Sequence, residues 1–371
     1  MSEYKMFAEM NKKNLEVWIN KRLYESQYWV NFFPMKNTPY LTFETLIGSE
    51  GNRVMADVVA YNSSAPLKTR KTISKLTGSI PSIRVKRQMT EQDINDYNAF
   101  KAMADPDKAE LLRIVFNDTN FCMDAILGRL EWFALQALST GQIILSTTNN
   151  VGGIVTESVV DFKLLAANKK KMVSADRCWI ETKEATCKPI TDIRAVVRAA
   201  KIAGANPQYI LMNESKFSVM VTMEEVKNFV MPYTTWGATK IAMVPSQDVL
   251  NQALKAMSLP QIVIIDTIVD YEDEDHTIHS VDPWLNASLE DKHVVFVENL
   301  QCGNTLRGPI AEETNPPPQV IQAKKGGILI STWSNVDPVT QFTKGEINAF
   351  PSCPAIDHIY NLDTEATTWA V

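Results

Sequence analysis

The sequence has no apolar run that approaches the about 18 uninterrupted residues of a membrane-spanning helix. Its N-terminus also lacks the long apolar core of a secretory signal. We therefore predict neither a membrane span nor secretion. The chain of 371 residues is 45% hydrophobic and 22% charged, which is typical of a globular protein with about two or three domains.

Cysteine is scarce and scattered. The five cysteines show no short repeating spacing, which excludes a recognisable disulfide framework or zinc ribbon. Cys178 and Cys187 have no histidine nearby, and we interpret them as packing thiols. This usage favours synthesis in a reducing compartment such as the cytoplasm.

The motifs of common enzymes are missing. There is no phosphate-binding loop, dinucleotide fingerprint, nucleophile elbow or H-E-x-x-H zinc motif. His276 and His279 follow the acidic run Glu272–Asp275, and such a cluster can bind a metal, but the turn signals favour an exposed hairpin tip. Gly152-Gly153 precedes no helix start and indicates a turn. We predict no enzyme and no catalytic, cofactor-binding or metal-binding residue.

Acidic residues are absent from one basic segment, Leu67–Thr90. It has three interpretations: a solvated loop, a nucleic-acid contact, or a ribbon that lies on an acidic neighbour. The segment has no Phe, Tyr or Trp to stack on bases, and the whole chain has a net charge of -6. We favour the ribbon. Its basic residues are Lys68, Arg70, Lys71, Lys75, Arg84, Lys86 and Arg87.

The N-terminal residues 1–47 predict one helix followed by an aromatic run, Tyr28–Pro34. Trp29, Phe32 and Phe33 in this run are too apolar to stay in water, so we expect them to dock on another surface. In the next segment, Arg53–Tyr61 and Ile83–Gln88 predict strands that flank a polar stretch without a core.

The clearest helix is predicted at Asp105–Thr140, with Asp105 as its N-cap and Gly141 beyond its end. Asn117–Asn120 are poor helix formers and allow a bend. Thr191 is expected to cap a second helix, which ends at Gly204.

The rest of the chain predicts mixed strands and short helices. Residues 142–163 and 262–280 are expected to form hairpins, and a tail without clear pattern begins at Phe350. The remaining predicted elements are a strand at Tyr209–Met212, a helix at Glu214–Val221 that follows Asn213, strands at His293–Val297 and Gln322–Ser331, and a proline-rich link at 312–320.

Three segments carry a family resemblance. Glu25–Gly48 (ESQYWVNFFPMKNTPYLTFETLIG) looks like an N-terminal arm, Arg194–Met220 (RAVVRAAKIAGANPQYILMNESKFSVM) is similar to an axial-domain helix and strand, and Val294–Pro316 (VVFVENLQCGNTLRGPIAEETNP) looks like a late strand with an acidic exit. Together with the order of elements, they resemble the major capsid proteins of tailed bacteriophages, which have the Hong Kong 97-type fold. The resemblance is strongest to the lambda-type capsid protein E family.

The resemblance implies an α+β chain built as a Hong Kong 97-type capsid fold. Its parts would be an N-terminal arm (1–47), an extended β-hairpin loop (48–90), a peripheral domain (91–187) with a spine helix (105–140), an axial domain (188–315), and a return to the peripheral domain with a C-terminal tail (316–371). The basic residues of the loop and the three aromatic residues of the arm would contact neighbouring subunits. We expect no covalent crosslink.

The implied function is self-assembly into hexamers and pentamers of an icosahedral shell around a double-stranded DNA genome. A portal protein at one vertex would be a partner, with scaffold and decoration proteins as further candidates. DNA would be enclosed without sequence-specific binding, no membrane would be involved, and assembly would take place in the host bacterial cytoplasm. The alternatives are an encapsulin-like compartment shell, a tail-tube or adaptor protein, and an α+β enzyme of unrecognised type.

Overall fold

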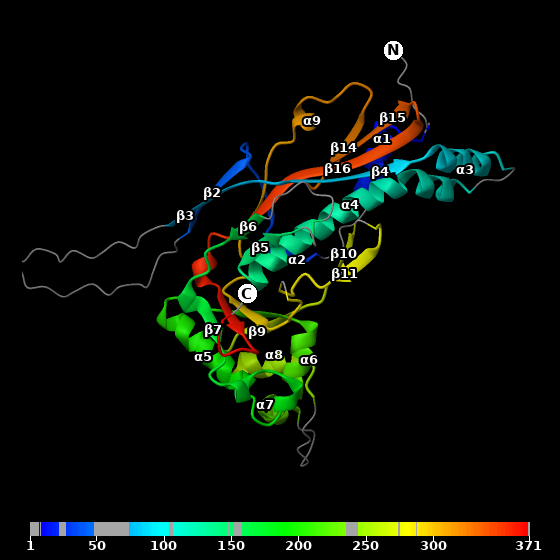
Figure 1. The fold of residues 1–371 in the computed structure, drawn as a ribbon. Helices are drawn as coiled ribbons and strands as arrows, with labels where there is room; N and C mark the ends of the chain where they lie inside the picture. Colours follow the sequence, from blue (N-terminus) through cyan, green and yellow to red (C-terminus); the bar gives the residue numbers. More distant parts are fainter. Residues whose placement is uncertain are drawn as a thin grey trace, which may run out of the picture.

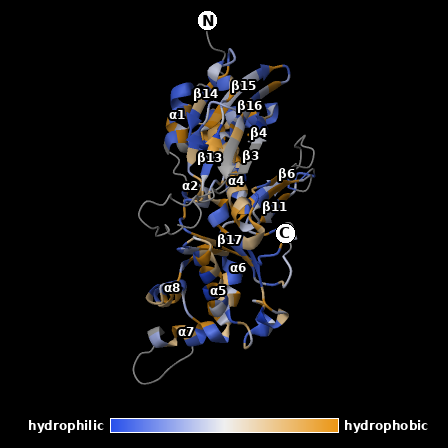
Figure 2. Ribbon diagram, turned by 90° about the vertical axis from the view of Figure 1, so that its left-hand side faces the viewer, coloured by the Kyte–Doolittle hydropathy of each residue, from blue (hydrophilic) through white to orange (hydrophobic). Residues whose placement is uncertain are grey.

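A computed structural model describes residues 7, 9–21, 27–47, 74–103, 107–146, 149–150, 158–234, 244–273, 275–286 and 288–369, and every structural statement below concerns this part of the chain. These residues form two lobes, one above the other (Figure 1). The upper lobe holds a six-stranded sheet and the longest helix. The lower lobe is built on a five-stranded sheet with four helices packed around it (Figure 2).

The sheet of the upper lobe is organised around its longest strand, β16. The strand order is β1-β13-β16-β15-β14, and β4 also pairs with β16. The first half of β16 thus lies between β15 and β4, whereas its last residues pair with β13. The strands are β1 (Met35–Asn37), β4 (Ser82–Met89), β13 (Asn304–Arg307), β14 (Ile321–Lys325), β15 (Ile328–Val336) and β16 (Val339–Ser352).

The second sheet joins the two lobes, because each of its faces packs on a different core. Ile210 and Met212 of β8 belong to the core of the lower lobe, whereas Leu211 between them belongs to the core of the upper lobe. This double burial explains why His293–Val297 is apolar at nearly every position. The order is β7-β17-β12-β8-β9, with β7 (Lys169–Lys171), β8 (Tyr209–Asn213), β9 (Gln261–Ile265), β12 (His293–Val297) and β17 (Tyr360–Asp363).

Helix α4 (Lys108–Ser139) confirms the long predicted helix and is about 48 Å long at ~1.5 Å per residue. It packs on β16 and β4, and it continues through Asn117–Asn120 because Thr119 and Cys122 are buried there. The predicted cap, Asp105, lies outside the described residues. The other helices are α1 (Lys12–Lys21), α2 (Tyr28–Phe32), α3 (Glu91–Lys101), α5 (Pro189–Ile202), α6 (Glu214–Thr222), α7 (Glu224–Thr234), α8 (Gln247–Ala256) and α9 (Ala311–Thr314).

Three two-stranded ribbons complete the fold. The hairpin predicted at 142–163 is confirmed by β5 (Gln142–Leu145) and β6 (Ser158–Asp161). The hairpin predicted at 262–280 is wrong in its first strand. Gln261–Ile265 forms β9 of the second sheet, and β10 (Val269–Glu272) pairs with β11 (Ile278–Val281) instead. The third ribbon joins β2 (Thr42–Ile47) to β3 (Ser74–Ser79).

Several local predictions are corrected at helix and strand ends. α5 begins at Pro189, and Thr191 lies in its first turn, where the Thr191 hydroxyl donates to Glu225 rather than capping the helix. In contrast, Asn213 does cap α6, since its side chain accepts from the Lys216 amide at 3.0 Å. The strand expected at Gln322–Ser331 is divided by a turn at Gly326-Gly327, and both glycines have positive φ.

The C-terminal region is more ordered than its sequence predicts. Instead of a tail without pattern from Phe350, β16 continues to Ser352 and β17 is inserted between β12 and β7. The Lys169–Lys171 run is an edge strand, β7. The lower lobe therefore takes in residues on both sides of the predicted axial domain, 188–315. The strand expected at Arg53–Tyr61 lies outside the described residues.

Candidate functional site

The ribbon β2–β3 lies apart from the two sheets (Figure 1). Its base is fixed to the core by Phe43, whose ring stacks on Phe350 with 5.6 Å between the ring centroids. Gly78 of β3 lies against the Phe43 ring so closely that a Cβ there would be 2.7 Å from a ring carbon. The ribbon is thus held in one position where it leaves the upper lobe.

The predicted basic residues are divided between two places. Lys75 lies on β3 opposite Leu46, so it belongs to the ribbon. Lys68, Arg70 and Lys71 lie outside the described residues. Arg84, Lys86 and Arg87 lie on β4, within the six-stranded sheet. The strand predicted at Ile83–Gln88 is therefore confirmed, but it is part of the upper lobe.

The cations of β4 have partners in their own chain. Arg84 lies opposite Glu346 in the β4–β16 register, and its Nη2 is 2.8 Å from the buried Glu346 carboxylate. The Lys86 Nζ is 4.9 Å from the centre of the Phe342 ring. The Arg87 Nε is 3.7 Å from an oxygen of the Asp118 carboxylate. Burial raises the pKa of Asp118, and the positive charge of Arg87 opposes this rise. These three residues stabilise the sheet.

Reversing Arg84 should weaken the fold. In Arg84→Glu, a second carboxylate would face Glu346, of which only 3% of the side chain is exposed. We expect the free energy of unfolding to fall by about 1–2 kcal/mol, measured by urea denaturation. Arg84→Gln, which adds no repulsion, should lose less. Equal losses in the two variants would contradict the repulsion argument.

The three aromatic residues of the arm, which we expected to contact a neighbouring subunit, lie in the interior of their own chain. Trp29, Phe32 and Phe33 are 6%, 1% and 0% exposed, so they dock on the chain's own core. The Glu131 carboxylate of α4 accepts hydrogen bonds from the amides of Tyr28 and Trp29, at 3.0 and 2.8 Å. The aromatic content correctly indicated docking, but it carried no information on which surface receives the arm.

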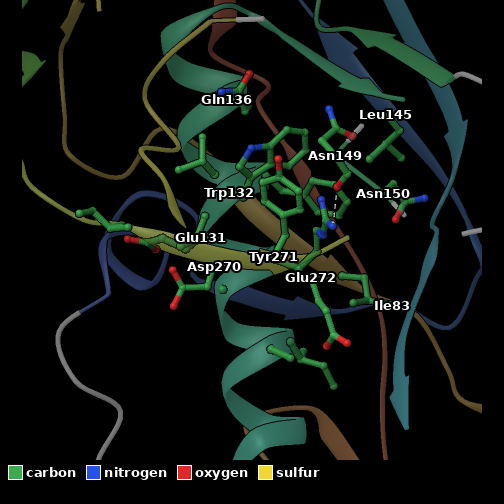
Figure 3. A pocket seen from close by; sticks show the side chains of 18 of the residues that line it. Ile83, Glu131, Trp132, Gln136, Leu145, Asn149, Asn150, Asp270, Tyr271 and Glu272 are labelled. Atoms are coloured by element: carbon green, nitrogen blue, oxygen red, sulfur yellow. Dashed lines mark hydrogen bonds between the residues drawn. The ribbon is translucent and has the colours of Figure 1, made fainter. Parts of the chain in front are cut away.

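A large groove lies between α4, β4 and the β10–β11 hairpin, with a volume of about 1210 Å³. Tyr271 lies beside Trp132 in its lining, and Asp270 and Glu272 of the same strand also line it (Figure 3). The Arg129 guanidinium donates to the Asn149 carbonyl at 2.8 Å. Burial lowers the pKa of Arg129. The lining of the groove is mostly apolar.

The acidic turn after β10 is held by its own histidines. His276 lies beside Glu272, and His279 Nε2 is 2.7 Å from Asp273 Oδ2. The bond from His279 lowers the pKa of Asp273. Within the described ranges, no group of three His, Cys, Asp or Glu side chains is placed to hold a metal ion.

The cysteines are all buried and free of disulfides. Burial raises the pKa of Cys122, Cys187 and Cys302 to about 12, so these thiols stay protonated at neutral pH. Cys178 also has a raised pKa, mainly from burial. The interpretation of Cys178 and Cys187 as packing thiols fits their place in the core of the lower lobe.

The fold is that of phage capsid proteins. The chain is similar to the solved structure of a protein assigned as the capsid protein of a prophage of E. coli CFT073, with a TM-score of 0.57, 16% identity and coverage of 95% of this chain and 99% of that one. It is also similar to a phage-related protein from Bordetella bronchiseptica RB50, with a TM-score of 0.55, 14% identity and coverage of 97% and 99%. Among curated proteins, no sequence match was found.

The family model for phage major capsid protein E matches residues 26–364. The chain therefore belongs to the family of phage major capsid protein E. It is a structural protein of the virion capsid that assembles with further copies into a shell, and it is not an enzyme. This match does not favour the encapsulin-like alternative. Of the helices described above, none is both long and apolar enough to cross a membrane.

Proposed function

We propose that copies of this chain form the hexamers and pentamers of an icosahedral shell, and that the part of the loop 48–90 that precedes β4 crosses onto the neighbouring copy. The observation that carries the proposal is the β2–β3 ribbon. It is anchored at Phe43, and its strands β2 and β3 form a two-stranded sheet of their own (Figure 1). An isolated two-stranded ribbon is marginally stable in water, so a second surface would stabilise it.

Charge supports the same arrangement. Lys68, Arg70, Lys71 and Lys75 lie in a segment without acidic residues, on a chain with a net charge of -6. The body of the next copy is therefore more acidic than the whole chain, and it attracts this segment and favours one docking register. We assign the neighbour contact to these four cations. Arg84, Lys86 and Arg87 fix the base of the segment through Glu346, Phe342 and Asp118.

The shell would enclose double-stranded DNA without reading its sequence. An acidic protein binds phosphate weakly, which is compatible with packaging and release of the genome. A portal protein at one vertex, and scaffold or decoration proteins, would complete the particle. Assembly would take place in the cytoplasm of the host bacterium.

The test is to reverse the four cations together. In the variant Lys68→Glu, Arg70→Glu, Lys71→Glu and Lys75→Glu, we expect a folded subunit with at least about tenfold fewer closed shells. Shells and rings would be counted by electron microscopy after sedimentation of the purified protein, alone and co-expressed with the genes that neighbour its own. Circular dichroism would confirm that the variant is folded.

The control changes net charge equally without touching the loop. Lys13, Lys171, Lys188 and Lys255 are exposed, and none forms an ion pair with a residue in the described ranges. Reversing these four should leave shell yield within about twofold of the unmodified protein. Normal shells from the loop variant would refute the loop contact. An unmodified chain that forms no rings or shells in either setting would refute the proposed assembly itself.

A further inference from the structure

The exposed face of α5 carries a basic stripe. Arg194, Arg198 and Lys201 recur at four- and three-residue steps, so they lie on one side of the helix. The adjoining side, which includes Ile193 and Val197, is buried in the lower lobe. Within the described ranges, no carboxylate pairs with any of the three cations. The stripe thus presents three positive charges on the exposed face of the helix.

An apolar hollow adjoins this stripe. It has a volume of about 540 Å³ and lies between the second half of α5 and the turn after α8. Ile202 and Met257 border it and are 70% and 53% exposed. We call the basic stripe and this hollow together the α5 patch. Large apolar side chains rimmed by charged ones mark a site of protein–protein contact.

The β10–β11 hairpin carries a surface complementary to the α5 patch, with acidic side chains next to an exposed apolar one. Asp270 and Glu272 are exposed and lie on β10 on either side of Tyr271. They are two residues apart on one strand, so they are about 7 Å apart, close to the about 6 Å between Arg194 and Arg198 on a helix. Ile278 pairs with Glu272 in the register and is 70% exposed.

The two surfaces lie on opposite sides of the molecule, with α5 at the left of the lower lobe and β10–β11 at the right (Figure 1). They cannot meet within one chain in this conformation. A contact between two different surfaces of identical chains is head to tail, and its repetition around an axis makes a ring.

We propose that the β10–β11 hairpin of one copy docks on the α5 patch of the next. Asp270 and Glu272 would pair with the cations of α5, and Ile278 would cover Ile202 and Met257. The hairpin is the favoured occupant because Glu272–Asp275 is the longest acidic run in the sequence and has an exposed isoleucine beside it. The inference rests on the proposed assembly, for which it names a second contact, separate from the loop.

The first test is a charge exchange. Asp270→Lys with Glu272→Lys, and separately Arg194→Glu with Arg198→Glu, should each reduce closed shells about tenfold or more. Combining all four substitutions should restore shells to at least half the unmodified yield. The control variant Glu181→Lys with Lys171→Glu, at exposed positions elsewhere, should leave the yield of closed shells unchanged. Failure of the combined variant to recover, with both pairs folded, would overturn the contact.

The second test needs no closed shells. All five native cysteines are buried, so a cysteine introduced at an exposed position is the reactive one. Chains with Glu272→Cys mixed with chains with Arg198→Cys should form a disulfide-linked pair under diamide, whereas Glu181→Cys with Arg198→Cys should not. Crosslinking in the first mixture alone supports the contact. If the crosslink is absent both from soluble protein and from shells, the contact is overturned. Shells formed by the unmodified chain would still support the proposed function in that case.

Discussion

Replacing Phe350 with alanine is expected to lower the free energy of unfolding by about 3–5 kcal/mol. Phe350 lies on β16 and is 2% exposed. Its ring centroid lies 5.6 Å from those of Phe43 and Phe133, and 6.0 Å from that of Phe162. These rings come from β2, α4 and the segment after β6, so their shared contact holds the base of the ribbon, the long helix and the sheet together.

Urea denaturation followed by tryptophan fluorescence would measure this loss. Phe350→Leu keeps most of the buried volume, so it should lose only about 1 kcal/mol. Tyr40→Ala, at a residue that is 68% exposed, should change stability by less than about 0.5 kcal/mol. If Phe350→Ala lost no more free energy of unfolding than Phe350→Leu, the aromatic cluster would not hold the lobe together.

Gly303→Ala is expected to destabilise the same lobe by about 3 kcal/mol or more. A Cβ at this position would overlap the carbonyl oxygen of Ser352, and it would lie 2.9 Å from the Phe33 ring. Because the first obstacle is backbone of β16, no side-chain rotation relieves it. The strands β13 and β16 must move apart at the place where the Phe33 arm is fixed.

The matched control is Gly128→Ala on α4. Its new Cβ would be 4.0 Å from the nearest side-chain atom, and alanine favours a helix over glycine by about 1 kcal/mol. The midpoint of thermal unfolding should therefore fall in Gly303→Ala and stay equal or rise in Gly128→Ala. Equal midpoints for Gly303→Ala and the unmodified protein would refute the close approach of β13 to β16.

The sequence predicted the elements whose signals are local. α4 follows from its apolar spacing, and α6 follows from Asn213 as a cap. The C-terminal strands were missed because their pairing depends on distant partners. The β7 strand shows the same limit: Lys169–Lys171 has no apolar alternation, and it becomes a strand only because β17 lies beside it.

The candidate site was predictable in part, for the same reason. A cluster of cations is visible in the sequence, but the division between ribbon and sheet depends on Glu346, which pairs with Arg84 from 262 residues away. The aromatic arm was recognised as a docking segment, while its receiving surface is formed by residues such as Glu131 and Thr305. The hollow next to the α5 stripe becomes visible only when the turn after α8 is placed beside α5.

The central position of β16 also governs when a newly made chain can complete its fold. β16 pairs with β4, β13 and β15, and β17 lies between β7 and β12, so each sheet is closed by a strand that is made after all of its partners. Earlier strands must wait for these distant partners, which makes folding slow. A truncated product that ends before β16 has no closed upper sheet, so translation errors of this kind yield no subunit with the complete surfaces that a growing shell would incorporate.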